Sequence, residues 1–382
     1  MRKKYKIGII GYGGFGQFLH SSWQSQAQLD VTAVADIQKL INIPDKIKFY
    51  TDHDSIIKDP ELDIISIATP PETHSKIAFA ALDAGKHVLV EKPMALNISQ
   101  AQEYKKRSQQ AKKIVMVDYM LRFNPIIMAI QSLGSMGLFG ELRRVLVENY
   151  AQDESLNLSH WFWDHSVSGG IFVEHGVHFF DLINAFSDSQ PTSISSYTHE
   201  RNNKQQDQVI AMVQYQSGLI ATHYHQFSRP GFFEDTLIRL VYDLAQIDIH
   251  GWITLSGKIK ILIKSQDIKK LSKIPNLLVS TSSLICDASD NSRPEGWGKN
   301  TIKADIGQIT SSGKKYEVDT ILEGEFNINE NKGQVYSASL CDLMLDFIRA
   351  IEDSDYVPKI TLEDSISSLA IALSASEKSR CY

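Results

Sequence analysis

From the N-terminus to about Asp118, short apolar runs alternate with longer amphipathic stretches. Apolar runs bounded by glycine or proline are typical of buried strands, and amphipathic stretches between them are typical of helices. The apolar runs cover residues 5–10, 29–35, 62–68, 87–90 and 114–118. This alternation predicts β–α–β units, and therefore an α/β domain with a parallel, Rossmann-like sheet over residues 1–122.

The rest of the chain has a different rhythm. Apolar runs without long helices between them cover residues 142–150, 208–215, 219–225 and 236–242. Because Gln216-Ser217-Gly218 separates two of these runs, we expect a hairpin and an antiparallel sheet. Helices are expected over about residues 170–186, 337–351 and 362–379. Residues 265–335 are polar and rich in turn residues, and they carry no motif that predicts a structure or a role.

The composition restricts the partners and the compartment. A chain of 382 residues exceeds what one core usually supports, which favours two domains. The net charge of -6 gives no electrostatic reason to expect nucleic acid or an anionic membrane as a partner. Cys286, Cys341 and Cys381 lack metal-ligand spacing, and their odd number favours a reducing compartment. With no apolar stretch long enough to span a membrane, we expect a cytoplasmic protein.

A glycine-rich turn follows the first predicted strand. Residues 11–16 read Gly-Tyr-Gly-Gly-Phe-Gly, which matches the G-x-G-x-x-G pattern that binds a pyrophosphate at a helix N-terminus. Asp36 ends the next strand 20 residues after Gly16, as expected for a carboxylate that binds an adenosine ribose. This carboxylate favours NAD, although Lys39 could accompany the 2′-phosphate of NADP. The alternative is a glycine turn required only for packing.

Lys92 lies directly after a predicted buried strand, in the sequence Glu91-Lys92-Pro93. In open α/β sheets, ligands bind outside the carboxyl ends of the strands. The lysine is therefore expected to point into the ligand cleft.

A second chemical signal lies in the predicted helix over residues 170–186. Glu174, His178 and Asp181 are spaced i, i+4 and i+7, which places them on one helical face among apolar residues. Burying three ionisable side chains among apolar residues costs free energy, and a catalytic acid–base site would explain why they are there. The alternative is a solvated helix face or a buried histidine–carboxylate network. No metal site is expected, because Ile171 stands where an H-x-x-E-H zinc motif needs histidine.

Taken in order, these motifs resemble those of the Gfo/Idh/MocA oxidoreductase family. The resemblance rests on the glycine fingerprint and on residues 69–74, 91–93, 122–125 and 174–178, and the closing helices extend it. It implies a Rossmann domain followed, over residues 123–382, by an α+β substrate-binding domain with an open, mostly antiparallel sheet. It also implies NAD(P), a sugar, cyclitol or related secondary alcohol as substrate, and a homodimer or homotetramer formed through that sheet. The closing helices could pack back on the first domain.

The resemblance also implies roles for single residues. Lys92 would contact the reacting oxygen, His178 would be the general acid/base, and Asp181 would bind substrate hydroxyls. Glu174 would complete the catalytic set, although it stands where sugar-active members usually have aspartate. The cofactor contacts expected are Gly11, Gly13, Gly14, Phe15, Gly16, Asp36, Thr69, Pro70, His74, Glu91 and Lys92.

Three further expectations compete with structural interpretations. Trp161 and Trp163 could form a platform for a sugar ring or a hydrophobic cluster that closes the cleft. Arg122 could reach substrate or cofactor, or it could form a structural ion pair. His74 could shape the nicotinamide pocket or simply pack at the start of a helix.

Two functions compete with a dehydrogenase or reductase. A redox-neutral glycosidase would retain NAD and use transient oxidation, and a non-catalytic sugar or dinucleotide sensor would use the same fold. Lys92 and His178 together count against a sensor, which has no need of both.

Overall fold

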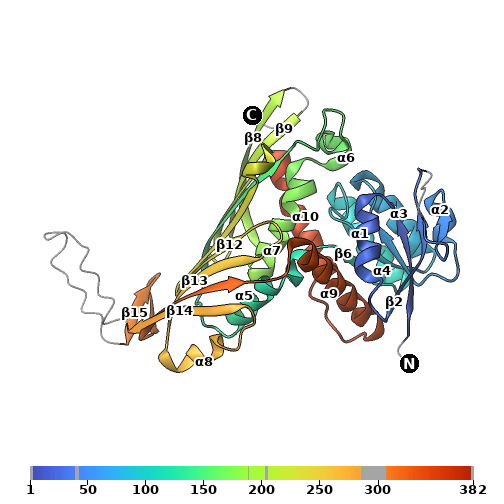
Figure 1. The fold of residues 1–382 in the computed structure, drawn as a ribbon. Helices are drawn as coiled ribbons and strands as arrows, with labels where there is room; N and C mark the ends of the chain where they lie inside the picture. Colours follow the sequence, from blue (N-terminus) through green and yellow to red (C-terminus); the bar gives the residue numbers. More distant parts are fainter. Residues whose placement is uncertain (1–2, 39–42, 188, 203–204, 285–306, 380–382) are drawn as a thin grey trace.

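The computed structural model describes residues 3–38, 43–187, 189–202, 205–284 and 307–379, which form two large sheets (Figure 1). The first sheet is parallel throughout, with strand order β3-β2-β1-β4-β5-β6. Its strands are β1 (Tyr5–Ile10), β2 (Leu29–Ala35), β3 (Lys48–Tyr50), β4 (Ile64–Ile67), β5 (His87–Val90) and β6 (Val115–Val117). Its helices are α1 (Gly14–Trp23), α2 (His53–Ile57), α3 (Pro71–Asp83) and α4 (Ile98–Ala111). The Rossmann-like sheet expected from the sequence is confirmed.

Burial explains why the central strands are apolar throughout. Every residue of β4 is buried, and so are Val88, Leu89 and Val90 of β5. A parallel sheet has helices on both faces, so its strands need apolar side chains on both sides. The carboxyl ends of β1, β2, β4 and β5 therefore meet at one edge, where the predicted ligand residues follow them.

The second sheet has nine strands in the order β14-β17-β13-β12-β11-β7-β10-β9-β8. All neighbouring pairs are antiparallel except β7 and β10, which confirms a mostly antiparallel sheet. The strands are β7 (Leu142–Gln152), β8 (Pro191–Asn202), β9 (Gln205–Tyr215), β10 (Ile220–Arg229), β11 (Asp235–Tyr242), β12 (Ala245–His250), β13 (Ser256–Ile263), β14 (Leu277–Leu284) and β17 (Thr320–Asn327). A separate hairpin joins β15 (Gln308–Ser311) and β16 (Lys314–Glu317).

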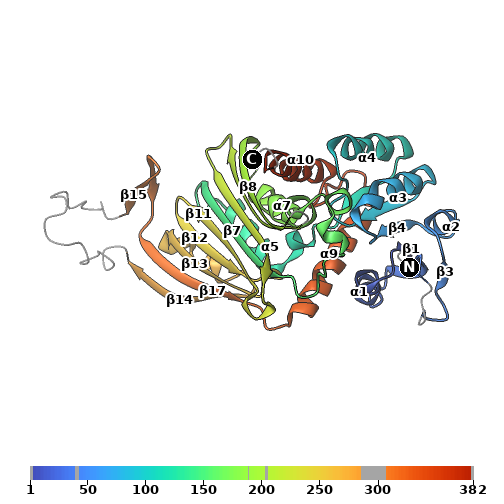
Figure 2. The same ribbon diagram turned by 90° about the horizontal axis from the view of Figure 1, so that it is seen from above.

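Helices α5 (Pro125–Ser135), α7 (Val177–Phe186) and α10 (Leu362–Ser379) lie on the side of this sheet that faces the first sheet (Figure 2). Side-chain bonds hold α10 to its neighbours, since Ser196 Oγ donates to Ala375 O at 2.7 Å and Asn184 Nδ2 donates to Ser368 Oγ at 3.1 Å. Short helical segments complete the fold: η1 (Met120–Phe123), η2 (Trp161–Trp163), α6 (His165–Ser168), η4 (Gly231–Phe233), η5 (Ser265–Asp267) and α8 (Ile268–Leu271).

The helix expected over residues 170–186 is not a regular α-helix. A π-helical turn, η3 (Phe172–Gly176), precedes α7, which begins only at Val177. A π turn inserts an extra residue, so the 3.6-residue spacing used to align Glu174 with Asp181 does not hold across it. Such turns are frequent at functional sites.

The closing helix α9 (Lys332–Glu352) returns to the first sheet and packs against α1. Trp23 Nε1 donates to Leu340 O at 3.2 Å, and the rings of Phe18 and Tyr336 lie 5.0 Å apart. A helix from the C-terminal part of the chain therefore packs against a helix of the first sheet, and the division at residue 122 stays a prediction.

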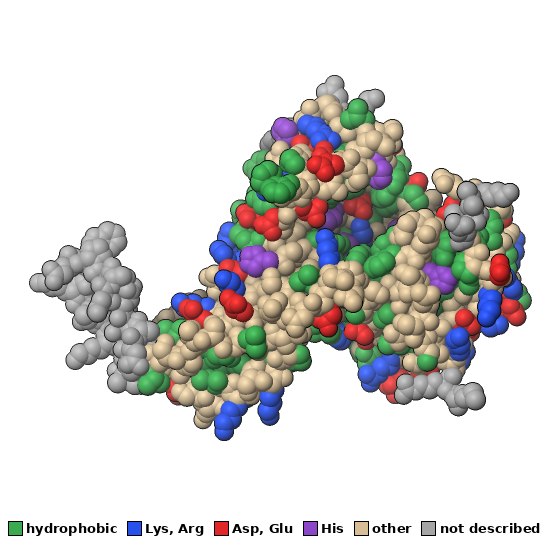
Figure 3. All heavy atoms as spheres, in the orientation of Figure 1, with side chains coloured by type: hydrophobic (Ala, Val, Ile, Leu, Met, Phe, Trp, Pro, Cys, Tyr) green, Lys and Arg blue, Asp and Glu red, His purple; other side chains and the backbone are tan. Residues whose placement is uncertain are grey.

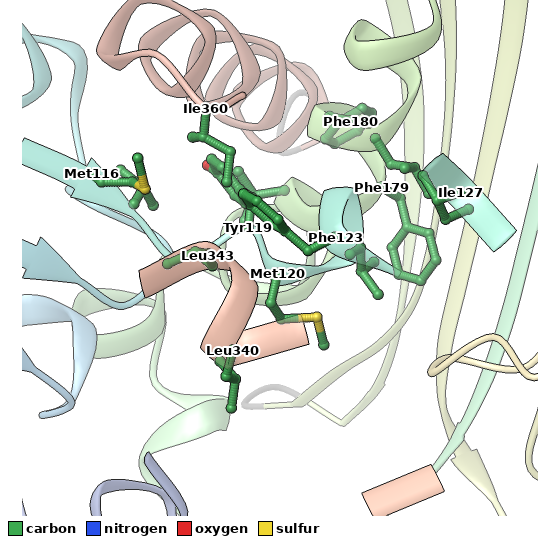
Figure 4. Packing of buried hydrophobic residues seen from close by; sticks show 14 of the residues in the cluster. Met116, Tyr119, Met120, Phe123, Ile127, Phe179, Phe180, Leu340, Leu343 and Ile360 are labelled. Carbon is green, nitrogen blue, oxygen red and sulfur yellow. The ribbon is translucent and has the colours of Figure 1, made fainter. Parts of the chain in front are cut away.

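Segment η1 links the two halves through a common apolar core. Figure 4 shows Met120 and Phe123 between the α9 side chains Leu340 and Leu343 and the α7 ring of Phe179. All five side chains are at most 2% exposed. This shared core fixes α7, which carries His178, relative to the strand ends of the first sheet.

Candidate functional site

The glycine turn is shaped for close approach of a pyrophosphate. Gly11 has φ +87°, and a Cβ at Gly16 would lie 2.1 Å from Gly11 O, so neither position accepts another residue without strain. By contrast, a Cβ at Gly13 or Gly14 would meet nothing within 4 Å, which leaves open space above the start of α1. No side chain caps this helix, so its first N–H groups are available to phosphate oxygens. The turn fits a dinucleotide.

Asp36 lies beside this turn at the end of β2. Its Oδ2 accepts a hydrogen bond from Tyr12 N and its Oδ1 accepts one from Gln38 N, both at 2.9 Å. These bonds fix the carboxylate, and each oxygen keeps a free lone pair for a ribose hydroxyl. A cavity of about 650 Å³ opens here, and its lining includes Gly11, Tyr12, Gly13, Asp36, Thr69, Pro70 and Trp161.

Lys92 and Glu174 meet across the two halves of the molecule. Lys92 Nζ donates to Glu174 Oε1 at 2.6 Å and to the backbone oxygen of Glu174 at 2.8 Å. Their side chains are 15% and 13% exposed, so the pair borders solvent. Figure 3 shows a hollow between the two lobes of the molecule. The structure thus brings together two residues that are 82 positions apart in the sequence.

His178 is held by aromatic rings. Its ring centroid lies 4.9 Å from that of Trp252 and 6.0 Å from that of Tyr119, both in edge-to-face geometry. Burial, followed by the positive charge of Lys92, holds the pKa of His178 well below its usual value. The imidazole is therefore neutral at pH 7. Nδ1 is buried without a hydrogen-bond partner among the described residues, whereas Nε2 is not one of the buried unpaired atoms.

Asp181 and Arg122 bind each other in the interior, whereas both were expected to bind substrate; those roles stay predictions. Arg122 Nε and Nη2 both donate to the Asp181 carboxylate at 2.7 Å, and Arg122 Nη1 donates to Lys359 O at 2.8 Å. Asp181 is 1% exposed and Arg122 is 5% exposed. Burial lowers the pKa of Arg122, but the carboxylate of Asp181 more than offsets this effect. The pair is a buried ion pair, which was the structural alternative for Arg122.

His74 links the turn before α3, at Thr69, to the segment after Lys92, at Pro93. Its ring nitrogens lie 2.8 Å from Pro93 O and 2.7 Å from Thr69 O, and the side chain is 1% exposed. It positions the Thr69-Pro70 turn against the segment after Lys92, rather than lining the pocket itself. Phe15 is half-buried and packs near Phe18 and Tyr336, with ring centroids about 6 Å apart.

The two tryptophans of η2 occupy different surroundings. Trp161 lines the dinucleotide cavity, although it was expected at the substrate. Trp163 is 5% exposed, and its indole N–H donates to Asn157 O at 3.1 Å, so it supports the preceding loop.

Two features at the site escaped the sequence analysis. Trp252, in the turn after β12, packs on His178, but a single tryptophan outside any motif gave no signal. Asp118 follows β6 beside Glu91, which follows β5, because Val90 and Val117 are paired in register. Burial, and then the charge of Asp118, raise the pKa of Glu91 well above its usual range. The sequence did contain a signal for this pair, because Glu91 and Asp118 each follow one of two neighbouring strands.

Other kinds of site find no support in the part of the chain that the structure describes. No cluster of histidine, cysteine, aspartate or glutamate there could hold a metal ion. Among the described helices, none combines the length and the apolar character needed to cross a bilayer.

Comparison with known protein families agrees with this geometry. The model for GFO_IDH_MocA, an oxidoreductase family with an NAD-binding Rossmann fold, matches residues 5–119, and the GFO/IDH/MocA C-terminal domain matches residues 127–243. The chain belongs to the Gfo/Idh/MocA family. It contains the two family domains in the expected order, with the glycine turn, Asp36 and Lys92 in the first match and Glu174 and His178 in the second.

Relatives within the Gfo/Idh/MocA family include enzymes for ring alcohols. The chain is 27% identical over 204 residues to the 1-carboxy-3-chloro-3,4-dihydroxycyclohexa-1,5-diene dehydrogenase of Comamonas testosteroni, covering 50% of each chain. It is 26% identical over 232 residues to an inositol 2-dehydrogenase/D-chiro-inositol 3-dehydrogenase of Lactiplantibacillus plantarum, covering 56% of this chain and 63% of the relative. The chain thus spans about half to two thirds of the length of these curated relatives.

The fold is also that of solved members of this family. The structure of myo-inositol 2-dehydrogenase from Lactobacillus plantarum superposes with a TM-score of 0.69 at 16% identity. The superposition covers 99% of this chain and 98% of that one.

Buried neutral histidines should make the protein sensitive to acid. Burial lowers the pKa of His175 to about 3 and holds that of His223 and His225 well below the usual value. Below pH ~6.5 the unfolded chain binds protons that the folded chain excludes. The free energy of unfolding should therefore fall as the pH drops, by up to about 1.4 kcal/mol per pH unit for each such histidine.

Urea unfolding between pH 4.5 and pH 7 measures this slope, with His223→Phe as the test variant. His223 stacks on Phe180 with ring centroids 4.3 Å apart, so phenylalanine suits the site. In His223→Phe the free energy of unfolding should fall less steeply with decreasing pH, by the contribution of one histidine. The control is His250→Phe, which changes an exposed histidine and should leave the slope as in the wild type. An unchanged slope in His223→Phe would show that this imidazole is already protonated or solvated.

Proposed function

We propose that the chain is an NAD(P)-dependent dehydrogenase or reductase that acts on a CH–OH group of a small ring alcohol. The observation that carries this proposal is the Lys92–Glu174 pair, with a neutral His178 on the adjoining helix, between the dinucleotide turn and the second sheet. The bound nicotinamide would supply the hydride chemistry, and the protein would orient it and move the proton.

In the oxidation direction, His178 Nε2 accepts the proton of the substrate hydroxyl. General-base help of this kind contributes about 10²–10⁴-fold. Lys92 donates to the same oxygen and stabilises the negative charge that develops there. Glu174 holds the lysine in place through its carboxylate and its backbone oxygen. In the reduction direction the imidazolium of His178 returns the proton to the carbonyl oxygen.

The relatives and the site support this substrate class. Two relatives are named as dehydrogenases of an inositol and of a cyclohexadiene diol, both of which are ring alcohols. With Asp181 bound to Arg122, fewer charged groups remain to bind several hydroxyls. The indole of Trp252, half-buried beside His178, offers an apolar surface to one face of a ring.

The test of this function is a panel of alcohols with NAD and NADP compared side by side. Inositols, cyclic diols, aldoses and sugar acids should be offered, and formation of the reduced cofactor followed. We expect turnover of at least one ring alcohol. If both cofactors bind tightly but no member of the panel reduces either, the dehydrogenase proposal fails and the sensor or redox-neutral alternative takes its place.

We propose NAD as the cofactor rather than NADP. The Asp36 carboxylate accepts ribose hydroxyls but repels a 2′-phosphate, and Ile37 and Gln38 beside it carry no positive charge. Wild-type protein should bind NAD at least about tenfold more tightly than NADP, because the 2′-phosphate of NADP would lie beside the like charge of the Asp36 carboxylate. Asp36→Ala should weaken NAD binding and bring the two affinities together. Calorimetry measures both constants, and equal or tighter NADP binding by the wild type would overturn the assignment.

We also propose that two copies associate through the outer face of the second sheet. On β9, Val209, Ala211 and Val213 are buried, and the alternate residues Ile210 and Met212 are 43% and 51% exposed. Ile220 on the neighbouring strand β10 is 37% exposed. Exposed apolar residues on adjacent strands are typical of an interface between copies. A monomeric mass in sedimentation equilibrium at micromolar concentration would contradict this proposal.

A further inference from the structure

One residue of the dinucleotide cavity comes from the other half of the chain. Among the described residues that line the cavity, all but one lie between Ile10 and Ile77. The exception is Trp161 of η2, in the loop that follows β7 of the second sheet. Its side chain is half-buried, so part of the indole faces the open space.

The loop that carries Trp161 is braced from the side of the second sheet. His160 Nδ1 accepts a hydrogen bond from Phe162 N at 3.2 Å, which starts the turn. Arg201 of β8 places its guanidinium 4.7 Å from the ring centroid of Trp163. These two contacts involve His160 and Trp163. The indole N–H of Trp161 itself makes no hydrogen bond within the described residues. The ring of His160, 5.3 Å away, and the apolar core set the position of Trp161, and the part of the indole that lines the cavity remains available to a ligand.

We propose that Trp161 stacks on a planar base of the bound dinucleotide and forms the wall of the cofactor site that the second sheet supplies. This inference rests on the proposed function, since it takes the cavity as the cofactor site. The glycine turn and Asp36 hold the pyrophosphate and a ribose, but they do not bind a base. A half-buried indole beside them supplies the apolar plane that a base requires.

The same turn also contacts the catalytic segment. The ring of Phe162 lies 4.7 Å from that of Phe227, which in turn lies 5.0 Å from His175. His175 is next to Glu174, the partner of Lys92. Stacking on Trp161 would thus fix η2 from the cofactor side and support the substrate site before the substrate arrives.

Calorimetric titration of NAD into Trp161→Ala tests the proposal without any substrate. Base–aromatic stacking is typically worth about tenfold or more in affinity by alanine replacement, so Kd should rise by about tenfold. Trp161→Phe keeps a ring and should restore most of the affinity. Leu158→Ala changes an apolar residue of the same loop that is 80% exposed, and it should bind NAD like the wild type. Because Trp161 packs against the core, Trp161→Ala should also lower the melting temperature without cofactor, so the four Kd values are compared at a temperature at which all four proteins are folded.

Titration with ADP identifies the base. Weaker ADP binding in Trp161→Ala assigns the stack to adenine, and a loss confined to NAD assigns it to nicotinamide. If Trp161→Ala binds NAD as tightly as the wild type, the Trp161 proposal is wrong while the dehydrogenase proposal stands. If the wild type binds no dinucleotide, the proposed function itself fails.

Discussion

Replacing Lys92 with methionine should lower kcat/KM for the alcohol substrate by about 10²–10³-fold, because one preorganised donor to the charged oxygen is lost. Methionine keeps most of the length and apolar volume of the lysine stem. The affinity for NAD should change little, since the phosphate turn and Asp36 lie on other strands. Initial rates and calorimetric titration measure the two quantities separately.

Two comparisons isolate this effect. Lys105→Met removes an exposed lysine that pairs with Glu363 on the surface, and it should leave kcat/KM unchanged. Glu174→Gln keeps Lys92 but weakens its fixation, so we expect a smaller loss than for Lys92→Met. Turnover that survives in Lys92→Met would show that another group stabilises the reacting oxygen.

Removing the charge of Asp181 should destabilise the fold by about 3 kcal/mol, because Asp181→Leu leaves the buried Arg122 guanidinium with only a 3.3 Å contact to the carboxylate of the partly exposed Asp364. Urea unfolding at pH 7 measures the loss. The double variant Arg122→Met/Asp181→Leu removes both charges and should recover much of the stability. Breaking the exposed Lys105–Glu363 pair should cost under about 1 kcal/mol.

This experiment also separates the two roles considered for Asp181. A buried ion pair predicts a large loss of stability with KM nearly unchanged in the protein that remains folded. A substrate ligand predicts the reverse, with a raised KM and near-normal stability. The second result would contradict the position of Asp181 in the structure.

The fold could be predicted from the sequence wherever periodicity was strong. The continuous apolar runs of the first sheet and the alternating runs of β7, β9, β10 and β11 appear within a few residues of their expected bounds. Strands β3, β8, β12, β13, β14, β15, β16 and β17 were not expected. Exposed residues dominate β8 and β14, and β3, β15 and β16 are only three or four residues long, so these five strands have little apolar signal. Strands β12, β13 and β17 alternate buried and exposed residues as β9 does, so their signal was present and was missed.

The site was predicted where local sequence determines position. Gly11, Asp36 and Lys92 each follow a strand, so the strand direction alone places them at the same edge. The partner of Arg122 could not be predicted, because the ion pair depends on how η1 and α7 pack and on the π turn before α7. The cavity that Trp161 lines could not be predicted either, since it depends on the contact between the two halves, and the contact of Trp252 with His178 depends on how the turn after β12 packs on α7.

Direct transfer of hydrogen from substrate to cofactor tests the central claim most closely. The best substrate from the panel should be labelled with deuterium at the reacting carbon and incubated with NAD and the wild-type protein. We predict that the deuterium appears on the reduced nicotinamide, with one ketone formed for each reduced cofactor. Product formed without reduced cofactor, or reduced cofactor that carries only solvent hydrogen, would contradict a dehydrogenase that uses His178 and Lys92 for direct hydride transfer.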